Sequence, residues 1–223
     1  MTTEPELKVD FYFSVRSPYS YLILPRMIML RNKYDININF KLVYPIAIRM
    51  PEFFKRKNLF TYFGWKMIDM KFKARRLGMK MVFPMRPDPI QQEALTGKIS
   101  DHQPYIFDIC HFLQAVEKDK QLDFALEVSK CIFGGVKDWH TDESLIGLTS
   151  KLGLNFHEIK ERVLQDKDKL IDEIKKNQKE QLQAGHHGVP LSVFNDKFFF
   201  GQDKFDELFE ELRKHGHIKI NEY

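Results

Sequence analysis

The sequence predicts an α/β fold in which the two ends of the chain build one sheet and the middle is helical. Two strand-like segments flank a helical one at the start, and two short strand segments precede a helix at the end. From about Ile48 to Gly185 the expected elements are all helices, with a methionine- and proline-rich loop at Met79–Pro89. We therefore expect a discontinuous sheet domain of residues 7–47 and 186–217 and a helical insertion of residues 48–185.

The first unit is β-α-β. Lys8–Ser14 alternates and is rich in aromatic residues, which is typical of a strand. A helix is expected from Ser17 to about Tyr34, with Pro25 kinking its interior. Asp35–Val43 has apolar residues on one face and is the second strand. Since a helix joins the two strands, we expect them to be parallel.

The middle of the chain has helical periodicity. Apolar residues at spacings of three and four predict an amphipathic helix over Leu59–Leu77, which Gly78 would end. Asn155 and Glu158 are spaced as a variant of the capping box. The charged segment Asp168–Ala184 indicates a solvated helix face. The other expected helices are Tyr105–Val116, Leu122–Phe133, Asp142–Leu152 and Phe156–Leu164.

The last unit is β-β-α. Val189–Asn195 and Lys197–Phe200 are predicted strands, joined by a tight turn at Asn195-Asp196. Gln202–His215 closes the chain as a helix whose apolar residues recur at helical spacing. Together with the first unit, this segment would complete the sheet.

The composition excludes several classes of protein. The chain has 223 residues and 43% hydrophobic content, enough for a core of its own. Its apolar runs are too short to span a bilayer, and Met1–Glu6 is acidic and polar, so we expect a cytoplasmic protein without membrane contact. Cys110 and Cys131 are the only cysteines, which argues against a disulfide framework or zinc site and favours buried thiols.

The positive charge is concentrated in one region. The net charge is +4, but Arg49 to Arg86 contains eleven Lys or Arg against two acids, a local balance of +9. Such a run is either a solvated helix face or a surface that attracts acidic ligands. The aromatic and glycine pattern of an RNA-binding sheet is missing, so we expect no nucleic-acid partner.

Ser17-Pro18-Tyr19-Ser20 forms a corner between the first strand and the first helix. Serine suits the N-cap and proline suits the first helical position. One interpretation is a helix cap and nothing more. The other is a binding site, because a hydroxyl, free backbone N–H groups and the positive end of a helix dipole favour an anion or a thiolate.

Three features of this sequence resemble the thioredoxin superfamily in its disulfide-oxidoreductase A form. Ser17-Pro18-Tyr19-Ser20 stands where those enzymes carry Cys-x-x-Cys, and Pro25 lies eight positions after Ser17, as in thioredoxins. Gly188-Val189-Pro190 resembles the motif whose proline is cis. The resemblance implies a thioredoxin fold with a large helical insertion.

With serine at the first cysteine position, the chain is most similar to 2-hydroxychromene-2-carboxylate isomerases and kappa-class glutathione transferases. Val9–Phe13 and Gly201–Lys204 match that group in order and spacing, as do the two motifs just named. Two places differ from the isomerase pattern. Ser14 replaces an acid, and the loop Ala47–Pro51 lacks the usual glycines and asparagine.

The resemblance implies glutathione as the cofactor. Ser17 would stabilise its thiolate, Val189 and cis-Pro190 would offer backbone to the peptide, and Gln202 and Asp203 would hold the γ-glutamyl end. Serine cannot exchange disulfides, and no histidine lies near Ser17 in the sequence to activate it as a nucleophile. We expect no metal, because His186 and His187 would point apart on a strand entry.

The function this predicts is a glutathione-dependent isomerase acting on a small, anionic, unsaturated electrophile. A kappa-class-like transferase that conjugates electrophiles is the alternative. A non-catalytic thioredoxin-fold binding protein is the alternative from another class. The family also implies a homodimer.

Overall fold

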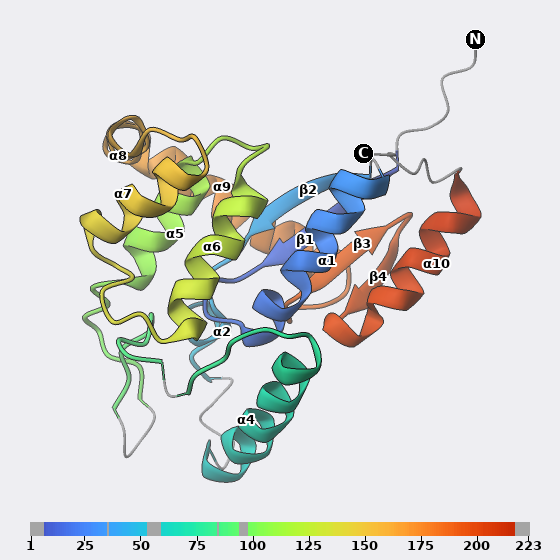
Figure 1. The fold of residues 1–223 in the computed structure, drawn as a ribbon, viewed down its shortest axis with the longest axis horizontal. Coiled ribbons are helices and arrows are strands. Elements are labelled where there is room, and N and C mark those ends of the chain that lie inside the picture. Colours follow the sequence, from blue (N-terminus) through green and yellow to red (C-terminus); the bar gives the residue numbers. More distant parts are fainter. Residues whose placement is uncertain (1–6, 35, 53–58, 84, 94–97, 217–223) are drawn as a thin grey trace.

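The computed structural model describes residues 7–34, 36–52, 59–83, 85–93 and 98–216. Its strands are β1 (Lys8–Phe13), β2 (Asn37–Leu42), β3 (Leu191–Phe194) and β4 (Lys197–Phe200), in the order β2-β1-β3-β4 (Figure 1). β1 is parallel to β2 and antiparallel to β3, and β3 is antiparallel to β4. The predicted α/β fold is therefore confirmed, with both ends of the chain in one sheet.

The two ends of the chain share one apolar core. Phe11 and Phe13 of β1 lie against Phe40 of β2, with ring centroids 6.2 and 5.3 Å apart. Helix α1 (Pro18–Tyr34), which contains the predicted Pro25, crosses the sheet, and α10 (Phe205–His215) lies beside it (Figure 1). Side chains alternate between the two faces of a strand, so these aromatic rings lie on one face of the sheet. Their packing holds β1 in place, and α1 begins five residues after β1 ends.

The middle of the chain is helical, as predicted. Thr141 and Asn155 cap two of these helices, and Asn155 accepts from the N–H groups of His157 and Glu158, which confirms the capping-box variant. Gly78 follows its helix with a φ of 65°, the left-handed conformation expected of a helix stop. The helices are α2 (Ile46–Arg49), α4 (Leu59–Arg76), α5 (Ile106–Ala115), α6 (Gln121–Gly134), α7 (Asp142–Lys151), α8 (Phe156–Gln165) and α9 (Lys167–Gln183).

The structure differs from the sequence prediction at three places. The loop after β2 contains the one-turn helix α2. Strand β3 begins at Leu191 rather than Val189, because Pro190 has no N–H to donate to a ladder. The last helix is preceded by a 3-10 turn, η1 (Gln202–Lys204). Asp35, the predicted start of the second strand, lies outside the described residues, and the division into two domains stays a prediction.

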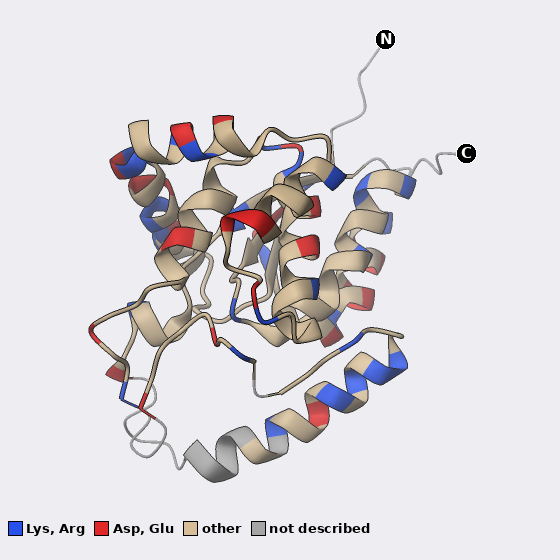
Figure 2. Cartoon of the chain, turned by 60° about the vertical axis from the view of Figure 1, so that its left-hand side comes forward, with Lys and Arg blue, Asp and Glu red and all other residues tan. Residues whose placement is uncertain are grey.

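Helix α4 lies apart from the sheet and close to the start of α1 (Figures 1 and 2). It carries five of the eleven basic residues that the sequence places between Arg49 and Arg86, and they appear as blue segments along the helix in Figure 2. Its inner face is fixed by the buried side chains of Met70 and Ala74. Among the described helices, none has both the length and the apolar character needed to cross a membrane.

Candidate functional site

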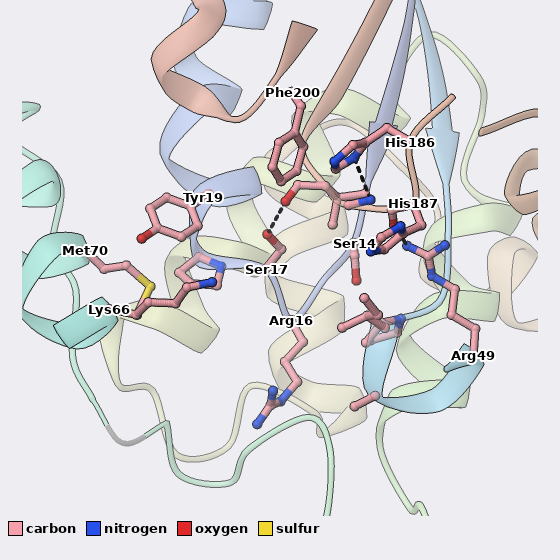
Figure 3. Close-up of a pocket in the computed structure, with 16 residues that line it drawn as sticks. Ser14, Arg16, Ser17, Tyr19, Arg49, Lys66, Met70, His186, His187 and Phe200 are labelled. Atoms are coloured by element: carbon pink, nitrogen blue, oxygen red, sulfur yellow. Dashed lines mark hydrogen bonds between the residues drawn. The ribbon is translucent and has the colours of Figure 1, made fainter. Parts of the chain in front are cut away.

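A pocket of about 380 Å³ opens where β1 ends and α1 begins (Figure 3). Its walls come from the β1–α1 corner, α2, α4, the segment before β3 and the end of β4. The residues that line it are Ser14, Arg16, Ser17, Pro18, Tyr19, Pro45, Ile46, Ala47, Arg49, Lys66, Met70, His186, His187, Gly188, Val189 and Phe200. The pocket thus joins segments from both ends of the chain and from the helical middle.

Ser17 both caps α1 and faces the pocket. Its Oγ accepts a hydrogen bond from the Ser20 N–H at 3.2 Å, the geometry of an N-cap. The same hydroxyl donates to the carbonyl oxygen of Val189 at 3.4 Å (Figure 3). The two interpretations of this serine are therefore compatible, because a single oxygen accepts on the helix side and donates on the pocket side.

The Val189–Pro190 peptide bond is cis, as the resemblance predicted. Val189 lines the pocket beside Ser17, whereas Pro190 is buried outside the lining. The Pro190 carbonyl accepts from the Gly201 N–H at 2.9 Å, which ties this segment to the end of β4. The structure thus brings Ser17 and Val189 together across most of the length of the chain.

Ser14 and Ser20 flank the corner with buried hydroxyls. Ser14 is 1% exposed and Ser20 is fully buried, and neither Oγ has a hydrogen-bond partner within the described part of the chain. Ser14 lines the pocket, but Ser20, at the position of the second cysteine in disulfide oxidoreductases, does not. Ser17 is therefore the member of the serine pair that a ligand in the pocket can reach.

Arg16 joins the corner to a distant loop. Its Nε and Nη2 donate to the two carboxylate oxygens of Asp88 at 2.7 and 3.0 Å, a bidentate pair. Asp88 also accepts from the Ile90 N–H at 2.9 Å. Arg16 thus ties the β1–α1 corner to the loop at Asp88, a contact that no local pattern in the sequence indicates.

Arg49 belongs to the basic run but is not on a solvated face. Its Nε donates to the Tyr44 carbonyl at 2.8 Å and its Nη2 to the His187 carbonyl at 2.6 Å. Burial lowers the pKa of Arg49 to about 10. Arg49 therefore holds the segment that precedes Val189 against α2, and the solvated-face interpretation is wrong for this residue.

His186 and His187 do not point apart. Their rings are parallel, at 2° and 5.2 Å between centroids, and His186 also contacts the Phe200 ring at 3.8 Å. The prediction is wrong because both residues precede β3, and the alternation of a strand does not apply there. Burial, followed by the neighbouring His187, lowers the pKa of His186. No group of three metal-ligating side chains occurs among the described residues.

Gln202 and Asp203 lie in η1, outside the pocket lining. Gln202 is buried, and Arg26 donates to its backbone carbonyl at 2.9 Å and to its side chain. Asp203 is exposed, and its carboxylate lies 2.6 Å from the Lys73 ammonium of α4. Of the predicted site residues, Ser17 and Val189 line the pocket, and Pro190, Gln202 and Asp203 lie outside its lining.

The four-stranded sheet, the capped helix α1 and the cis-proline beside it define a protein of the thioredoxin-fold class. The chain belongs to the family of DSBA-like thioredoxin domains, whose model matches residues 8–213. The predicted superfamily and the predicted thioredoxin fold with a helical insertion are confirmed. No curated protein matches the sequence.

Several solved structures share the fold. A 2-hydroxychromene-2-carboxylate isomerase has a TM-score of 0.70 at 17% identity, and the match covers 93% of this chain and 95% of that one. A probable DsbA oxidoreductase from Streptomyces coelicolor has 0.65 at 16%, covering 95% and 92%. The cytosolic disulfide reductase DsbM from Pseudomonas aeruginosa with GSH has 0.56 at 12%, covering 93% and 100%. At these identities the likeness shows the fold.

Proposed function

We propose that this protein is a glutathione-dependent isomerase of the 2-hydroxychromene-2-carboxylate isomerase type. The observation that carries the proposal is the position of the Ser17 hydroxyl, at the N-terminus of a long helix, in a pocket, and 3.4 Å from the carbonyl that precedes a cis-proline. A hydroxyl can donate to a sulfur atom but cannot form a disulfide. A thioredoxin fold with serine at this corner is therefore suited to hold the thiol of a ligand rather than to exchange one.

The energies support this role for Ser17. A thiol like that of glutathione titrates near ~8.5, so only a few per cent is ionised at neutral pH. A charge-assisted hydrogen bond contributes about 1.5 to 3 kcal/mol, and a helix N-terminus about 0.3 to 1 kcal/mol. Together they would lower the pKa of the bound thiol by roughly 1 to 3 units and make the thiolate abundant at neutral pH.

The reaction that follows is a reversible addition. The thiolate sulfur forms a bond to an electrophilic carbon of an unsaturated substrate, and the electron pair of the double bond moves toward the conjugated group. Rotation about the resulting single bond and loss of the thiolate restore the double bond in the other geometry. Lys66 in the pocket wall supports an anionic substrate, because it places positive charge near it. The charge of Arg16, in the same wall, is paired with Asp88.

Two alternatives remain open to experiment. In a kappa-class-like transferase the same thiolate would form a thioether that leaves as the product. In a non-catalytic binding protein, the backbone beside Val189 would hold a peptide without any reaction. We further propose that the protein is cytoplasmic and that it forms a homodimer. Sedimentation of the purified chain tests the oligomeric state directly, and fractionation of cells that express it tests the location.

Glutathione binding and consumption separate the three functions. The isomerase should bind glutathione in calorimetry and need it only in catalytic amount, so free thiol should stay constant while product accumulates. Stoichiometric loss of thiol would instead assign a transferase. Peptide binding without affinity for glutathione would favour the binding protein.

A further inference from the structure

A second cavity, of about 490 Å³, lies within the helical middle of the chain. It opens between α5, α7 and α8, which lie together at the left of Figure 1, and the start of α9 borders it. Of the described residues that line it, none also lines the pocket at Ser17. A cavity of this volume is large enough for a small organic ligand.

The inner wall of this second cavity is apolar and largely aromatic. Phe112, Trp139 and Leu145 line it and are 3%, 1% and 6% exposed. The ring of Tyr105 lies edge-to-face with two other rings of the wall, 6.0 Å from that of Trp139 and 4.4 Å from that of His140. A ligand ring placed here would gain both hydrophobic burial and edge-to-face contacts. The wall therefore favours a ligand with an aromatic ring.

Among the described residues, four charged side chains line the same cavity, two acidic and two basic. Asp142 and Lys160 form an ion pair at 2.9 Å. Asp108 of α5 and Lys167 of α9 are exposed, and neither side chain makes a hydrogen bond or ion pair within the part of the chain that the structure describes. Both lie near His111, whose pKa is lowered by burial and by Lys167, while Asp108 opposes them. The charges of the cavity therefore balance, but one acid and one base stay unpaired.

We propose that this cavity binds a free α-amino acid with an aromatic side chain. The ring would lie against Phe112 and Trp139. The ammonium would meet Asp108, and the carboxylate would meet Lys167. A zwitterion suits the cavity better than a cation or an anion, because each charge of the ligand then faces an unpaired charge of opposite sign. This inference is independent of the proposed function, since the two sites share no residue.

Calorimetry with L-phenylalanine and three analogues tests the class of ligand. 3-Phenylpropionate lacks the ammonium, 2-phenylethylamine lacks the carboxylate, and L-alanine lacks the ring. We expect L-phenylalanine to bind at least about tenfold more tightly than each analogue, because each analogue loses either a charge-assisted hydrogen bond or the burial of the ring.

Trp139 reports where the ligand binds. The chain has two tryptophans, so in a Trp65→Phe background Trp139 is the only one left. Addition of L-phenylalanine should change its fluorescence, because the indole lies in the wall of the cavity.

Two variants test the pairing of charges. Asp108→Asn should weaken L-phenylalanine binding by about tenfold or more and leave the affinity for 3-phenylpropionate unchanged, since that analogue has no ammonium. Lys167→Met should weaken L-phenylalanine binding similarly and leave the affinity for 2-phenylethylamine unchanged. Lys169→Met is the matched control, because it removes an exposed charge from the same helix outside the lining and should bind every probe as the wild type does.

The inference is overturned if L-phenylalanine does not bind up to about 10 mM, or binds without changing the fluorescence of Trp139. It is also overturned if Asp108→Asn and Lys167→Met weaken all the probes equally, or weaken none of them. Glutathione binding is measured separately, so this inference and the proposed function can fail independently of each other.

Discussion

Ser17 shows how one side chain can serve the helix and the pocket at once. Its hydroxyl oxygen accepts a hydrogen bond from the Ser20 N–H and donates one to the Val189 carbonyl. The hydroxyl therefore already makes one accepted and one donated hydrogen bond before any ligand arrives. A bound thiolate would accept the hydrogen bond that the Ser17 hydroxyl now donates to the Val189 carbonyl. The cap would persist, because it uses the oxygen and not the hydrogen.

The first prediction concerns the bound thiol. Ser17→Ala keeps the N-terminus of α1 but removes the donor, so the pKa of bound glutathione should rise by ~1 to 2 units. An ultraviolet titration of the complex measures this directly through thiolate absorbance. Wild-type thiolate should be present at neutral pH and be lost as pH falls through its depressed pKa, whereas the variant should lose it at higher pH.

A matched control is available one turn further along the helix. Ser20→Ala makes the same chemical change at a buried hydroxyl outside the pocket lining. It should leave the thiol titration as in the wild type. If bound glutathione has the same pKa in the wild type and in Ser17→Ala, Ser17 acts only as a helix cap. Loss of such a cap costs about 1 kcal/mol of stability.

The second prediction concerns acid sensitivity at His111. This side chain is 5% exposed, and its Nε2 lies 2.8 Å from the Tyr44 hydroxyl. Burial and the charge of Lys167 lower its pKa, with Asp108 opposing them. The unfolded chain therefore takes up this proton first as pH falls through about 6.5, so the folded state loses stability there.

Urea denaturation at several pH values tests this assignment. His111→Gln can still bond to Tyr44 but does not titrate, so its free energy of unfolding should fall less than that of the wild type between about pH 7.5 and 5.5. An identical slope in both proteins would mean that His111 takes up its proton equally readily in the folded and unfolded states.

Most elements could be predicted from the sequence because their signals are local. The spacing of apolar residues fixed the long helices to within a few residues, and Asn195-Asp196 adopts the positive φ values, 47° and 59°, of the predicted tight turn. Helix α2 was missed, since four residues are too few to show a period of 3.6. The start of β3 was predicted at Val189 but lies at Leu191. The apolar periodicity does not show that Pro190, which lacks an N–H, interrupts the backbone hydrogen bonds of the sheet.

The site could be predicted only in part, for a related reason. Ser17 and the cis-proline are parts of local motifs. Arg16, Arg49 and Lys73 act through partners 72, 138 and 130 positions away, and nothing near them in the sequence identifies those partners. The acidic partner of Lys73 was predicted as a ligand contact, but its pairing with α4 required the three-dimensional structure.

The third prediction concerns the end of α6. Gly135 has a φ of 82°, and an added Cβ would lie 3.4 Å from the Val82 side chain. Gly135→Ala should lower the free energy of unfolding by about 1 to 2 kcal/mol, because a side chain is disfavoured in the left-handed conformation. Gly147→Ala is the opposite case, in the open interior of α7, and should stabilise by about 0.5 to 1 kcal/mol. Urea denaturation of both variants should give shifts of opposite sign.

At the scale of the whole molecule, a chain of hydrogen bonds connects the helical middle to the cis-proline segment. His111 of α5 meets the Tyr44 hydroxyl, the Tyr44 carbonyl accepts from Arg49, and Arg49 also donates to the His187 carbonyl. These contacts cross between segments that the sequence assigned to different domains. We infer that the pocket depends on both.

The fourth prediction tests that dependence. Arg49→Met removes both bonds to backbone carbonyls and should lower the free energy of unfolding by about 2 kcal/mol. Arg49→Lys can keep one of the two bonds, so its loss should be smaller. Urea denaturation should give the free energy of unfolding in the order wild type, Arg49→Lys, Arg49→Met, from highest to lowest. Equal stability of wild type and Arg49→Met would mean that the cost of burying the guanidinium cancels the two bonds.

The serines of the corner also decide how the protein withstands oxidants. Cys110 is buried and Cys131 half-buried, and burial raises the pKa of both thiols, which leaves them protonated and slow to react. Peroxides and alkylating agents attack thiolates, so the chain itself offers them little. Under the proposed function, the only thiolate in the pocket arrives with glutathione and departs with it. An oxidised sulfur would then be discarded with the spent ligand and replaced from the cellular pool, whereas a Cys-x-x-Cys enzyme keeps such damage in its own side chains.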